Sequence, residues 1–407
     1  MSFTLAEARA ADAADPLRPL RDRFHLPEGL IYLDGNSLGP LPKTAAARLD
    51  SVVTQEWGES LIRSWNDHDW IGAPQRLGAK IALLIGAKAH EVIVADSTSV
   101  NLFKLLAAAA RLSDRKTLLS ESGNFHTDLY IAGGVADLLG LALEVAPRAE
   151  LEARIGADTN LLLLTHVHYK TAERFDMARI TAGAKAAGAM TVWDLSHSAG
   201  AIPLHLNEAG AELAVGCGYK YLNGGPGAPA FLYVAESLHE RLVSPLRGWM
   251  GHAAPFAFTD DYAPAAGIDR FLAGTPPILS LAALECGLDA FEGVTMARLW
   301  TKSRAMFDVF HALMEQRCPD LLCISPRGED QRGSHISFVH PHAFEICQAL
   351  IEADVIGDFR APDVVRFGLT PLYLGFEDIW VGVDRLATIM TSESWREPRF
   401  SVRGKVT

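Results

Sequence analysis

Lys220 and Asp194 are two residues whose side chains could do chemistry together. Lys220 lies in GCGYKYLNGGPG (216–227), between two tyrosines and just after the apolar run AELAVG, and Asp194 ends the run MTVWD. Lys220 follows Asp194 by 26 positions, which allows one connecting segment and one further strand. A buried carboxylate needs a cationic partner, and a desolvated lysine has a lowered pKa that makes it a nucleophile. Alone, either residue could be an ordinary surface charge.

Polar and aromatic residues follow two earlier strand-like runs. Thr98 and Ser99 come after VIVA (92–95), ahead of a helical pattern, where hydroxyl and backbone N–H groups either bind an anion or only cap the helix. Phe125 follows TLLS (117–120) and could lie on a flat ligand or only pack at a helix start.

Two more strand-like runs end in polar residues. LLLL leads into Thr165, His166 and His168, and MTVWD is followed by His197 three positions after Asp194. Alternate histidines share one face of a strand, but no third ligand is near in sequence, so we expect no metal site.

Together these residues match what one cofactor needs. A hydroxyl-rich helix start suits a phosphate, an aromatic side chain suits a flat ring, an acid suits a ring nitrogen, and a lysine suits an imine. Pyridoxal phosphate (PLP) makes all four demands. Ligands of open α/β sheets bind beyond the carboxyl ends of the strands, where all these residues are expected. We therefore predict a PLP site.

The elements that must position this site alternate between strands and helices. Short apolar runs at 92–95, 117–120, 161–167, 190–196 and 211–216 are separated by amphipathic stretches, which predicts a mostly parallel sheet covered by helices. Helices are also expected over 44–57, 74–86 and 292–317. From about residue 318, a strand–helix–strand pattern predicts a small α+β domain.

Composition excludes several classes of protein. The 407 residues carry a formal charge of -12 without a basic run, so nucleic-acid binding is not expected. The five cysteines form no CxxC pair, which indicates reduced thiols. No signal peptide or membrane-length apolar run is present, and we predict a cytoplasmic protein that does not bind membranes.

The motifs resemble those of the fold-type I aminotransferase superfamily and, within it, the kynureninase family. WDLSHSAG with GYKYLNGGPG is the most specific pair, and the resemblance runs from about 25 to 395. It implies a seven-stranded, mostly parallel sheet between helices in a large PLP-binding domain (61–300). It further implies a small α+β domain (301–407), and an N-terminal arm and helices (1–60) that join this small domain. It also implies a homodimer with its active site at the subunit interface. The other motifs are YLDGNSLGPLP (32–42), STSVNLF (97–103), NFHTD (124–128), RGWMGH (247–252), FLAGTPPILSLAAL (271–284) and VRFGLTPLY (365–373).

The resemblance also implies residue roles. Lys220 would form the imine with the cofactor, Asp194 would pair with its ring nitrogen, and Tyr219 would transfer protons. Arg366 would bind the substrate's α-carboxylate through its bidentate fork, and Asn36 and Trp65 would shape the substrate side. The remaining cofactor contacts would be Thr98, Ser99, Phe125, Asp128, Thr165, His197, Trp249 and Thr275. The position of Thr275 is usually Asn in the family and comes from the partner subunit, and Thr has a shorter reach.

The activity implied is hydrolysis of the Cβ–Cγ bond of L-kynurenine, or of 3-hydroxykynurenine, to anthranilate or 3-hydroxyanthranilate and L-alanine. The tryptophan at position 65 resembles bacterial members of the family, which prefer kynurenine over its 3-hydroxy form. This reaction would serve tryptophan catabolism or NAD biosynthesis. Rival interpretations are a cysteine desulfurase or selenocysteine lyase, an aminotransferase, or a non-catalytic protein of the same fold. A desulfurase needs a cysteine on a mobile loop, and the corresponding stretch 327–338 has none.

Overall fold

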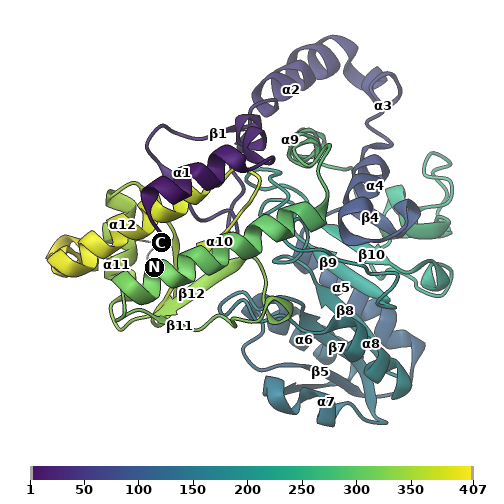
Figure 1. Ribbon diagram of the computed structural model, residues 1–407. Helices are drawn as coiled ribbons and strands as arrows, with labels where there is room; N and C mark the ends of the chain where they lie inside the picture. The colour runs from purple at the N-terminus through teal and green to yellow at the C-terminus, as the bar shows by residue number, and fades with distance from the viewer. Residues whose placement is uncertain (1–2, 405–407) are drawn as a thin grey trace.

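The computed structural model describes residues 3–404 and contains two main β-sheets, each covered by helices (Figure 1). A seven-stranded sheet and its helices occupy the right of the view, and a four-stranded sheet lies to the left beside the long helix α10.

The larger sheet has the order β4-β10-β9-β8-β7-β5-β6, and only β10 runs antiparallel to its neighbours. The predicted mostly parallel, seven-stranded sheet is therefore confirmed. The sequence patterns indicated five of its strands. They missed β6, an edge strand that is largely unburied, and β10, a short run after a glycine-rich turn. The bounds are β4 Val92–Val94, β5 Thr117–Glu121, β6 Ala142–Ala146, β7 Thr159–Thr165, β8 Met190–Asp194, β9 Leu213–Gly216 and β10 Phe231–Val234.

Apolar cores on both faces explain why the central strands read as continuous apolar runs. In β7, Leu161 and Leu163 belong to one buried cluster and Leu162 and Leu164 to the other, as strand alternation requires. The covering helices are α4 Ala73–Ile85, α5 Thr98–Ala109, α6 His126–Leu139, α8 Met177–Ala186 and α9 Ile278–Asp289.

The smaller sheet is antiparallel throughout, and its two faces differ in chemistry. Phe338 and Phe367 pack against Phe310 of α10, whereas Ser337 and Arg366 are paired across strands on the opposite face. This α+β unit was predicted from about residue 318. Its elements are α10 Met296–Arg317, β11 Leu322–Cys323, β12 His335–Val339, α11 Ala343–Glu352, β14 Asp358–Arg360, β15 Val364–Gly368 and α12 Phe376–Ser392.

The N-terminal segment packs on this smaller unit. Helix α1 (Leu5–Ala14) lies along α12, and β2 (Ile31–Tyr32) pairs in parallel with β13 (Val355–Ile356). A second short pair joins β1 (Phe24–His25) to β3 (Leu41–Pro42). The domain boundaries at 60 and 300 stay predictions.

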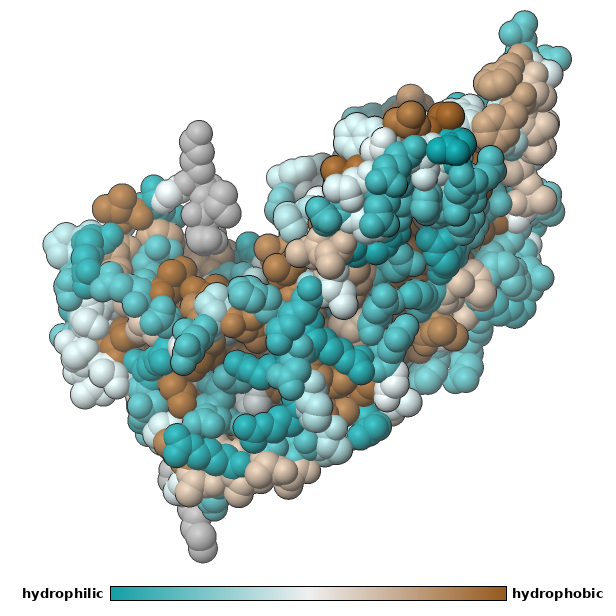
Figure 2. Space-filling view, turned by 90° about the horizontal axis from the view of Figure 1, so that it is seen from above, coloured by the Kyte–Doolittle hydropathy of each residue, from teal (hydrophilic) through white to brown (hydrophobic). Residues whose placement is uncertain are grey.

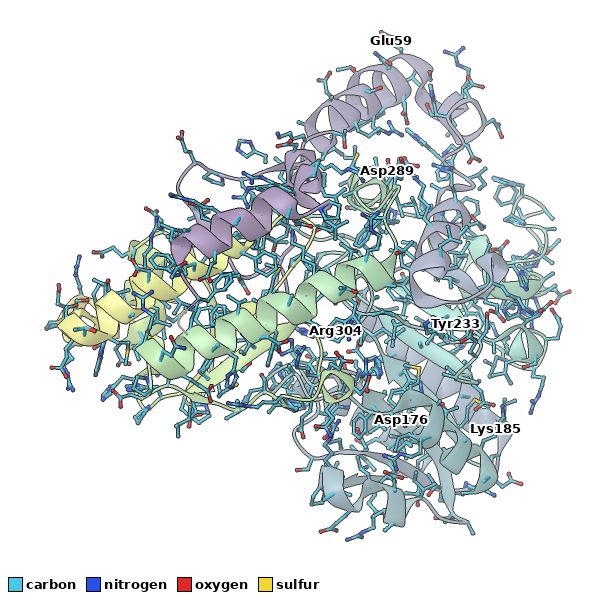
Figure 3. All side chains as sticks on the ribbon, in the orientation of Figure 1. Glu59, Asp176, Lys185, Tyr233, Asp289 and Arg304 are labelled. Atoms are coloured by element: carbon cyan, nitrogen blue, oxygen red, sulfur yellow. The ribbon has the colours of Figure 1, made fainter. Side chains whose placement is uncertain are left out.

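The helix predicted over 44–57 is divided in the structure. Helix α2 (Ala45–Ser51) continues as a π-helix, η2 (Val52–Ser60), and ends where Leu61 takes a positive φ of 53°. With η3 (Leu61–Arg63) and α3 (Ser64–Asp67), it forms an arm that stands away from the body, with Glu59 at its outer end (Figure 3).

The remaining elements are short. They are η1 Arg18–Arg23, η4 Ala89–Glu91, η5 Ala110–Leu112, η6 Arg148–Glu150, α7 Leu151–Arg154, η7 Glu236–Leu238, η8 Trp249–Gly251, η9 Gly267–Phe271, η10 Glu329–Gln331, η11 Ser394–Arg396 and η12 Pro398–Ser401. Within residues 3–404 no helix is both long and apolar enough to cross a membrane.

Candidate active site

The carboxyl ends of three neighbouring strands bring the predicted residues together. Thr165 ends β7 and pairs with Asp194, which ends β8, and the next parallel strand, β9, leads into Lys220. The expectation that adjacent strands carry the acid and the amine is confirmed. Because parallel strands end at one edge of a sheet, residues far apart in sequence become neighbours here.

Lys220 lies among aromatic rings and a buried histidine. Its Nζ is 3.0 Å from Nε2 of His197, and 5.7 and 5.9 Å from the ring centroids of Phe125 and Tyr219. Burial, followed by the neighbouring Cys217, raises the pKa of Tyr219, so its hydroxyl keeps its proton at neutral pH. Tyr221 is buried with its ring edge-on to His197.

The glycines after Lys220 first serve the turn itself. Gly225 and Gly227 have positive φ values of 80° and 75°, which suit glycine. A side chain at Gly224 would meet the Gly218 carbonyl at 2.7 Å. Gly227 also lines the cavity described below, where the lack of a side chain lets the backbone approach a ligand closely.

Burial led us to expect a cationic partner for Asp194, but within residues 3–404 it forms no ion pair. Its Oδ1 accepts a hydrogen bond from the Ser196 backbone N–H at 2.7 Å, and its carboxyl group reaches that of Asp128. Burial, followed by the charge of Asp194, raises the pKa of Asp128 well above its usual range. Two buried carboxyl groups side by side call for a shared proton or a cation, and the protonated ring nitrogen of PLP is such a cation.

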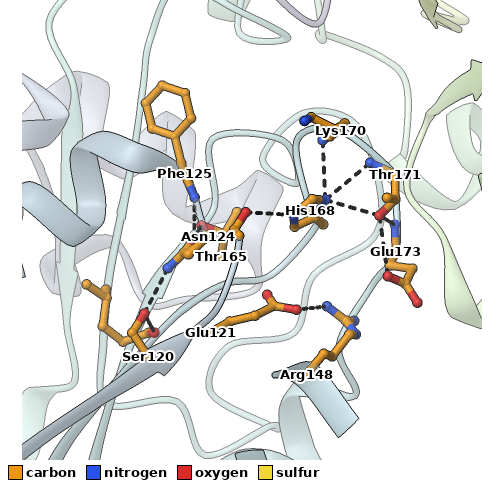
Figure 4. A network of polar contacts seen from close by, with 12 residues as sticks. Ser120, Glu121, Asn124, Phe125, Arg148, Thr165, His168, Lys170, Thr171 and Glu173 are labelled. Carbon is orange, nitrogen blue, oxygen red and sulfur yellow. Dashed lines mark hydrogen bonds and ion pairs between the residues drawn. The ribbon is translucent and has the colours of Figure 1, made fainter. Parts of the chain in front are cut away.

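Thr165 contacts Asp128 of this carboxyl pair and is itself bonded to Asn124, as Figure 4 shows for the Thr165–Asn124 contact. Thr165 Oγ1 donates to Asn124 Oδ1 at 2.5 Å and also lies 3.2 Å from Asp128 Oδ2. Asn124 accepts from the Phe125 backbone N–H at 2.7 Å and donates to Ser120 at 3.1 Å. The loop that carries Phe125 is therefore attached to the edge of the sheet.

The start of α5 has the features of a phosphate site. Ser97 caps the helix by accepting from the Val100 N–H at 3.3 Å, and Thr98 and Ser99 lie in the first turn. They were expected just before the helix, and the helix in fact begins at Thr98. A cavity of about 420 Å³ opens here, lined by Ser97, Tyr219 and Thr275 among others. Free N–H groups at a helix start favour an anion.

Arg366 is fully buried and already held in place. Its Nε donates to Asp358 Oδ1 at 2.9 Å, Nη2 reaches the other Asp358 oxygen and Ser37 Oγ, and Nη1 donates to the Tyr169 carbonyl. Asp358 on the adjacent strand holds the guanidinium on its Nε side, and its own pKa is lowered by Arg366. One N–H group, on Nη1, has no partner among the described residues, so a carboxylate bound at the outer edge would also have to displace Ser37 from Nη2.

The remaining predicted residues lie at different distances from this centre. Asn36 is fully buried in the loop whose Gly39 N–H donates to the Tyr219 carbonyl at 2.8 Å. Trp65 packs edge-on to Trp70 on the arm, and Trp249 is exposed with its ring against Phe256. Among the described residues, no recorded contact joins Trp65 or Trp249 to Lys220.

Sequence reasoning assigned no role to four residues that the structure places at the site. Asn124 and Ser37 lie inside quoted motifs, and their positions beside Phe125 and Asn36 were the available signal. Asp358 could have been found as an acid eight residues before Arg366 across a hairpin. His335 gave no signal, because its strand reads as ordinary core.

Comparison with known proteins supports the same family. Residues 299–386 match the family described as "Kynureninase C-terminal domain". The chain is 49% identical to the kynureninase of Pseudomonas fluorescens over 414 residues, covering 99% of this chain and 100% of that one. The chain belongs to the kynureninase family. The kynureninase of Burkholderia mallei strain SAVP1 is likewise 49% identical over 99% of this chain and 100% of its own length.

Solved structures confirm the fold of this kynureninase-family enzyme. The apo cysteine desulfurase of Thermococcus onnurineus NA1 superposes with a TM-score of 0.78 at 20% identity, covering 92% of this chain and 98% of its own. A C-DES mutant with glycine covalently linked to its PLP cofactor gives 0.80 at 17% identity, covering 90% and 98%. The enzyme is a PLP-dependent hydrolase of the PLP fold-type I class. The desulfurase likeness concerns the fold alone.

The cysteines offer no persulfide-forming site. Cys217, Cys286, Cys318 and Cys347 are buried, and burial is the largest cause of their raised pKa values. Cys323 is half-buried, with its sulfur 3.7 Å from the Ser325 carbonyl. A raised pKa leaves little thiolate, the form that would act as nucleophile.

Proposed function

We propose that this enzyme hydrolyses the Cβ–Cγ bond of L-kynurenine to give anthranilate and L-alanine, and that the edge formed by β7, β8 and β9 is where it does so. The 3-hydroxy substrate would give 3-hydroxyanthranilate by the same steps. The observation that carries the proposal is the convergence of Lys220, Asp194, Asp128 and the start of α5 at one sheet edge.

The chain's residues divide the binding of the cofactor among them. PLP supplies an electron-withdrawing ring conjugated to the substrate's α-carbon. Asp194, with Asp128 behind it, holds the proton on the ring nitrogen. Phe125 covers the ring, and the N–H groups at Thr98 and Ser99 bind the phosphate. His197 lies beside Lys220, where its Nε2 orients the lysine amine.

Lys220, Tyr219 and Arg366 act on the substrate. Lys220 Nζ takes the proton from the α-carbon, and the outer guanidinium edge of Arg366 binds the α-carboxylate. Water adds to the γ-carbonyl carbon, the Cβ–Cγ bond breaks, and its electron pair stays on the β-carbon. Tyr219 Oη delivers the proton that this carbon needs, a general-acid step worth about 10²–10⁴-fold. One water is consumed for each anthranilate and alanine released.

A spectral and fluorescence experiment tests this assignment. Lys220→Ala should lose both the visible cofactor band and the release of fluorescent anthranilate, measured with kynurenine and 3-hydroxykynurenine side by side. Lys185→Ala is the control, because Lys185 lies on α8 with an exposed side chain that pairs with Glu212 (Figure 3). Normal anthranilate release by Lys220→Ala would contradict the proposal.

We also propose that two copies of the chain pair and complete each other's active sites. Large apolar side chains are exposed on the arm and on the loop after Trp249, namely Trp57, Leu61, Ile62, Phe256 and Phe258. Figure 2 shows apolar patches exposed between polar residues on one face of the molecule. Trp249 and Thr275 are both exposed, and Trp249 packs against Phe256 of that loop.

Mixing two inactive variants tests the shared site. If Trp249 acts on the partner's cofactor, a mixture of Lys220→Ala and Trp249→Ala chains should regain activity, because one site of each mixed dimer has both native residues. Sedimentation should show a dimer. A monomer, or a mixture no more active than its components, would contradict this arrangement. With the proposed hydrolysis of kynurenine we also propose a cytoplasmic location and a role in tryptophan catabolism or NAD biosynthesis.

A further inference from the structure

His335 is a fully buried histidine whose ring nitrogens form no hydrogen bond among the described residues. It begins β12, is 0% exposed, and neither ring nitrogen has a hydrogen-bond partner among residues 3–404. Buried polar side chains are nearly always hydrogen-bonded, so this ring calls for an explanation. On the same face of the sheet lie Ser337 and Arg366, which pair directly across the strands.

His335 lies next to the histidine that contacts the site lysine. The ring centroids of His335 and His197 are 5.5 Å apart, and His197 Nε2 is 3.0 Å from Lys220 Nζ. His197 Nδ1 is also buried without a partner in the described part of the chain. The three side chains form a series that starts in the C-terminal sheet and ends at the amine.

The chemistry of the series assigns the protons. Burial, followed by the charge of Lys220, lowers the pKa of His197 well below its usual range, so the ring is neutral. An ammonium group can only donate, so a neutral His197 facing it must accept at Nε2 and carry its proton on Nδ1. That buried Nδ1–H needs an acceptor, and a neutral His335 has one free ring nitrogen to offer.

We propose that His335 is a positioning residue that accepts the His197 Nδ1–H through one buried water, and thereby keeps His197 Nε2 free to accept from Lys220. This rests on the proposed function only in taking Lys220 as the site lysine. The hydrogen bond made by one ring nitrogen decides which tautomer a histidine adopts. A water bridge would serve the same purpose as direct contact.

The other charged groups around the pair do not replace this contact. Arg366 and Arg360 act on His197 as cations and offer no acceptor, since arginine only donates. Around His335 the further groups are Asp358 and His168. Both oxygens of Asp358 are engaged by Arg366, and His168 is bonded to the Gly123 carbonyl at 2.8 Å.

The protein without cofactor gives the cleanest test. Pulse acetylation with acetic anhydride at a series of pH values, read by peptide mass spectrometry, reports the pH midpoint at which the Lys220 amine becomes reactive. His335→Phe keeps the ring shape and removes both nitrogens. His197 can then turn its Nε2–H toward Lys220, and the ammonium loses its acceptor. The midpoint should fall by about one pH unit, which is about tenfold faster labelling below the midpoint.

Two further variants separate positioning from loss of structure. His335→Gln retains an acceptor and should restore the midpoint to that of the parent. Ile336→Ala removes a buried side chain from the opposite face of β12, and should lower the melting temperature while leaving the midpoint unchanged. If His335→Phe does not fold, His335→Leu removes the same nitrogens in a smaller side chain.

An unchanged midpoint in a folded His335→Phe or His335→Leu variant would overturn the proposal, as would an equal shift in Ile336→Ala. Adding PLP to the parent should protect Lys220 from acetylation. Lack of protection would contradict the proposed function while the comparison of variants without cofactor still reports on His335.

Discussion

Replacing Asp194 by Asn should have opposite effects on the enzyme without and with its cofactor. Asp194 and Asp128 are buried side by side, and the charge of Asp194 helps to raise the pKa of Asp128. Asn is the same shape, carries no charge and can donate to Asp128. Without cofactor the substitution removes a repulsion, and with cofactor it removes the anion that holds the ring-nitrogen proton.

The expected change in the free energy of unfolding follows from the free-energy cost of burying Asp128 and Asp194 side by side. Two unit charges about 4 Å apart at an effective dielectric of about 20 repel by about 4 kcal/mol. Holding a proton at pH 7 on a carboxyl with an unfolded pKa of about 3.9 costs a similar amount. These are upper limits, and we expect Asp194→Asn to stabilise the cofactor-free protein by about 1–3 kcal/mol. For a chain of this length that is a rise in melting temperature of about 1–4 °C.

The pH dependence has a definite sign. Asp128 holds its proton more tightly in the folded than in the unfolded protein, since its folded pKa is raised. Its stabilising contribution is complete below about pH 4 and is lost as the pH rises toward the folded pKa. The cofactor-free parent should therefore lose stability between pH 5 and 8 more steeply than Asp194→Asn.

Differential scanning fluorimetry with and without PLP, over this pH range, measures both effects. The parent should gain more from PLP than Asp194→Asn does, and the variant should lose most of its activity. Asp269→Asn is the matched control, because burial also raises the pKa of Asp269 but its side-chain partner is the uncharged Gln75. A cofactor-free Asp194→Asn that melts below the parent, or an equal gain from PLP in both, would refute the reasoning.

Three other substitutions address the edges of the site. Arg366→Lys should raise KM for kynurenine at least about tenfold with the visible band retained, because lysine cannot fork to Asp358 and a substrate carboxylate together; an unchanged KM in the anthranilate assay would exclude the role. Ser97→Ala should destabilise the protein by about 1 kcal/mol in urea unfolding and weaken PLP binding, because the Val100 N–H loses its hydrogen bond to the Ser97 side chain. If neither the stability nor the PLP affinity changes, Ser97 does not contribute to the phosphate site. Lys104→Met should lower the melting temperature and the PLP affinity, because the buried Lys104 ammonium contacts both Asp96, at 2.5 Å, and the Phe271 carbonyl, at 2.7 Å. An unchanged PLP affinity in a fluorescence titration would show that these two contacts do not support the site.

The secondary structure near the site was largely predictable. Continuous apolar runs such as LLLL predicted β7 correctly, because a strand buried on both faces has no polar side. Helix α4 follows its apolar spacing to within a residue. The arm was less predictable, because the step from α2 into a π-helix depends on packing rather than on helix propensity.

The neighbours of each site residue were less accessible to prediction. Asp194 was expected to face a cation and instead faces Asp128, a residue in the first turn of α6. Arg366 was expected to bind a carboxylate, but its hold on Asp358 depends on the pairing of β14 with β15. His335 gave no signal at all, since its role depends on the small sheet meeting His197.

The order of residue types along the chain was enough to assign the cofactor class and the reacting lysine, because PLP needs an acid, an amine, an aromatic ring and an anion site that follow successive strands. The protonation and orientation of these groups were settled only by the tertiary structure. The raised pKa of Asp128 beside Asp194, the hold of Asp358 on Arg366 and the contact of His197 with Lys220 each depend on burial and on partners from distant elements. Burial makes such polar contacts strong, and only the folded chain decides which groups are buried together.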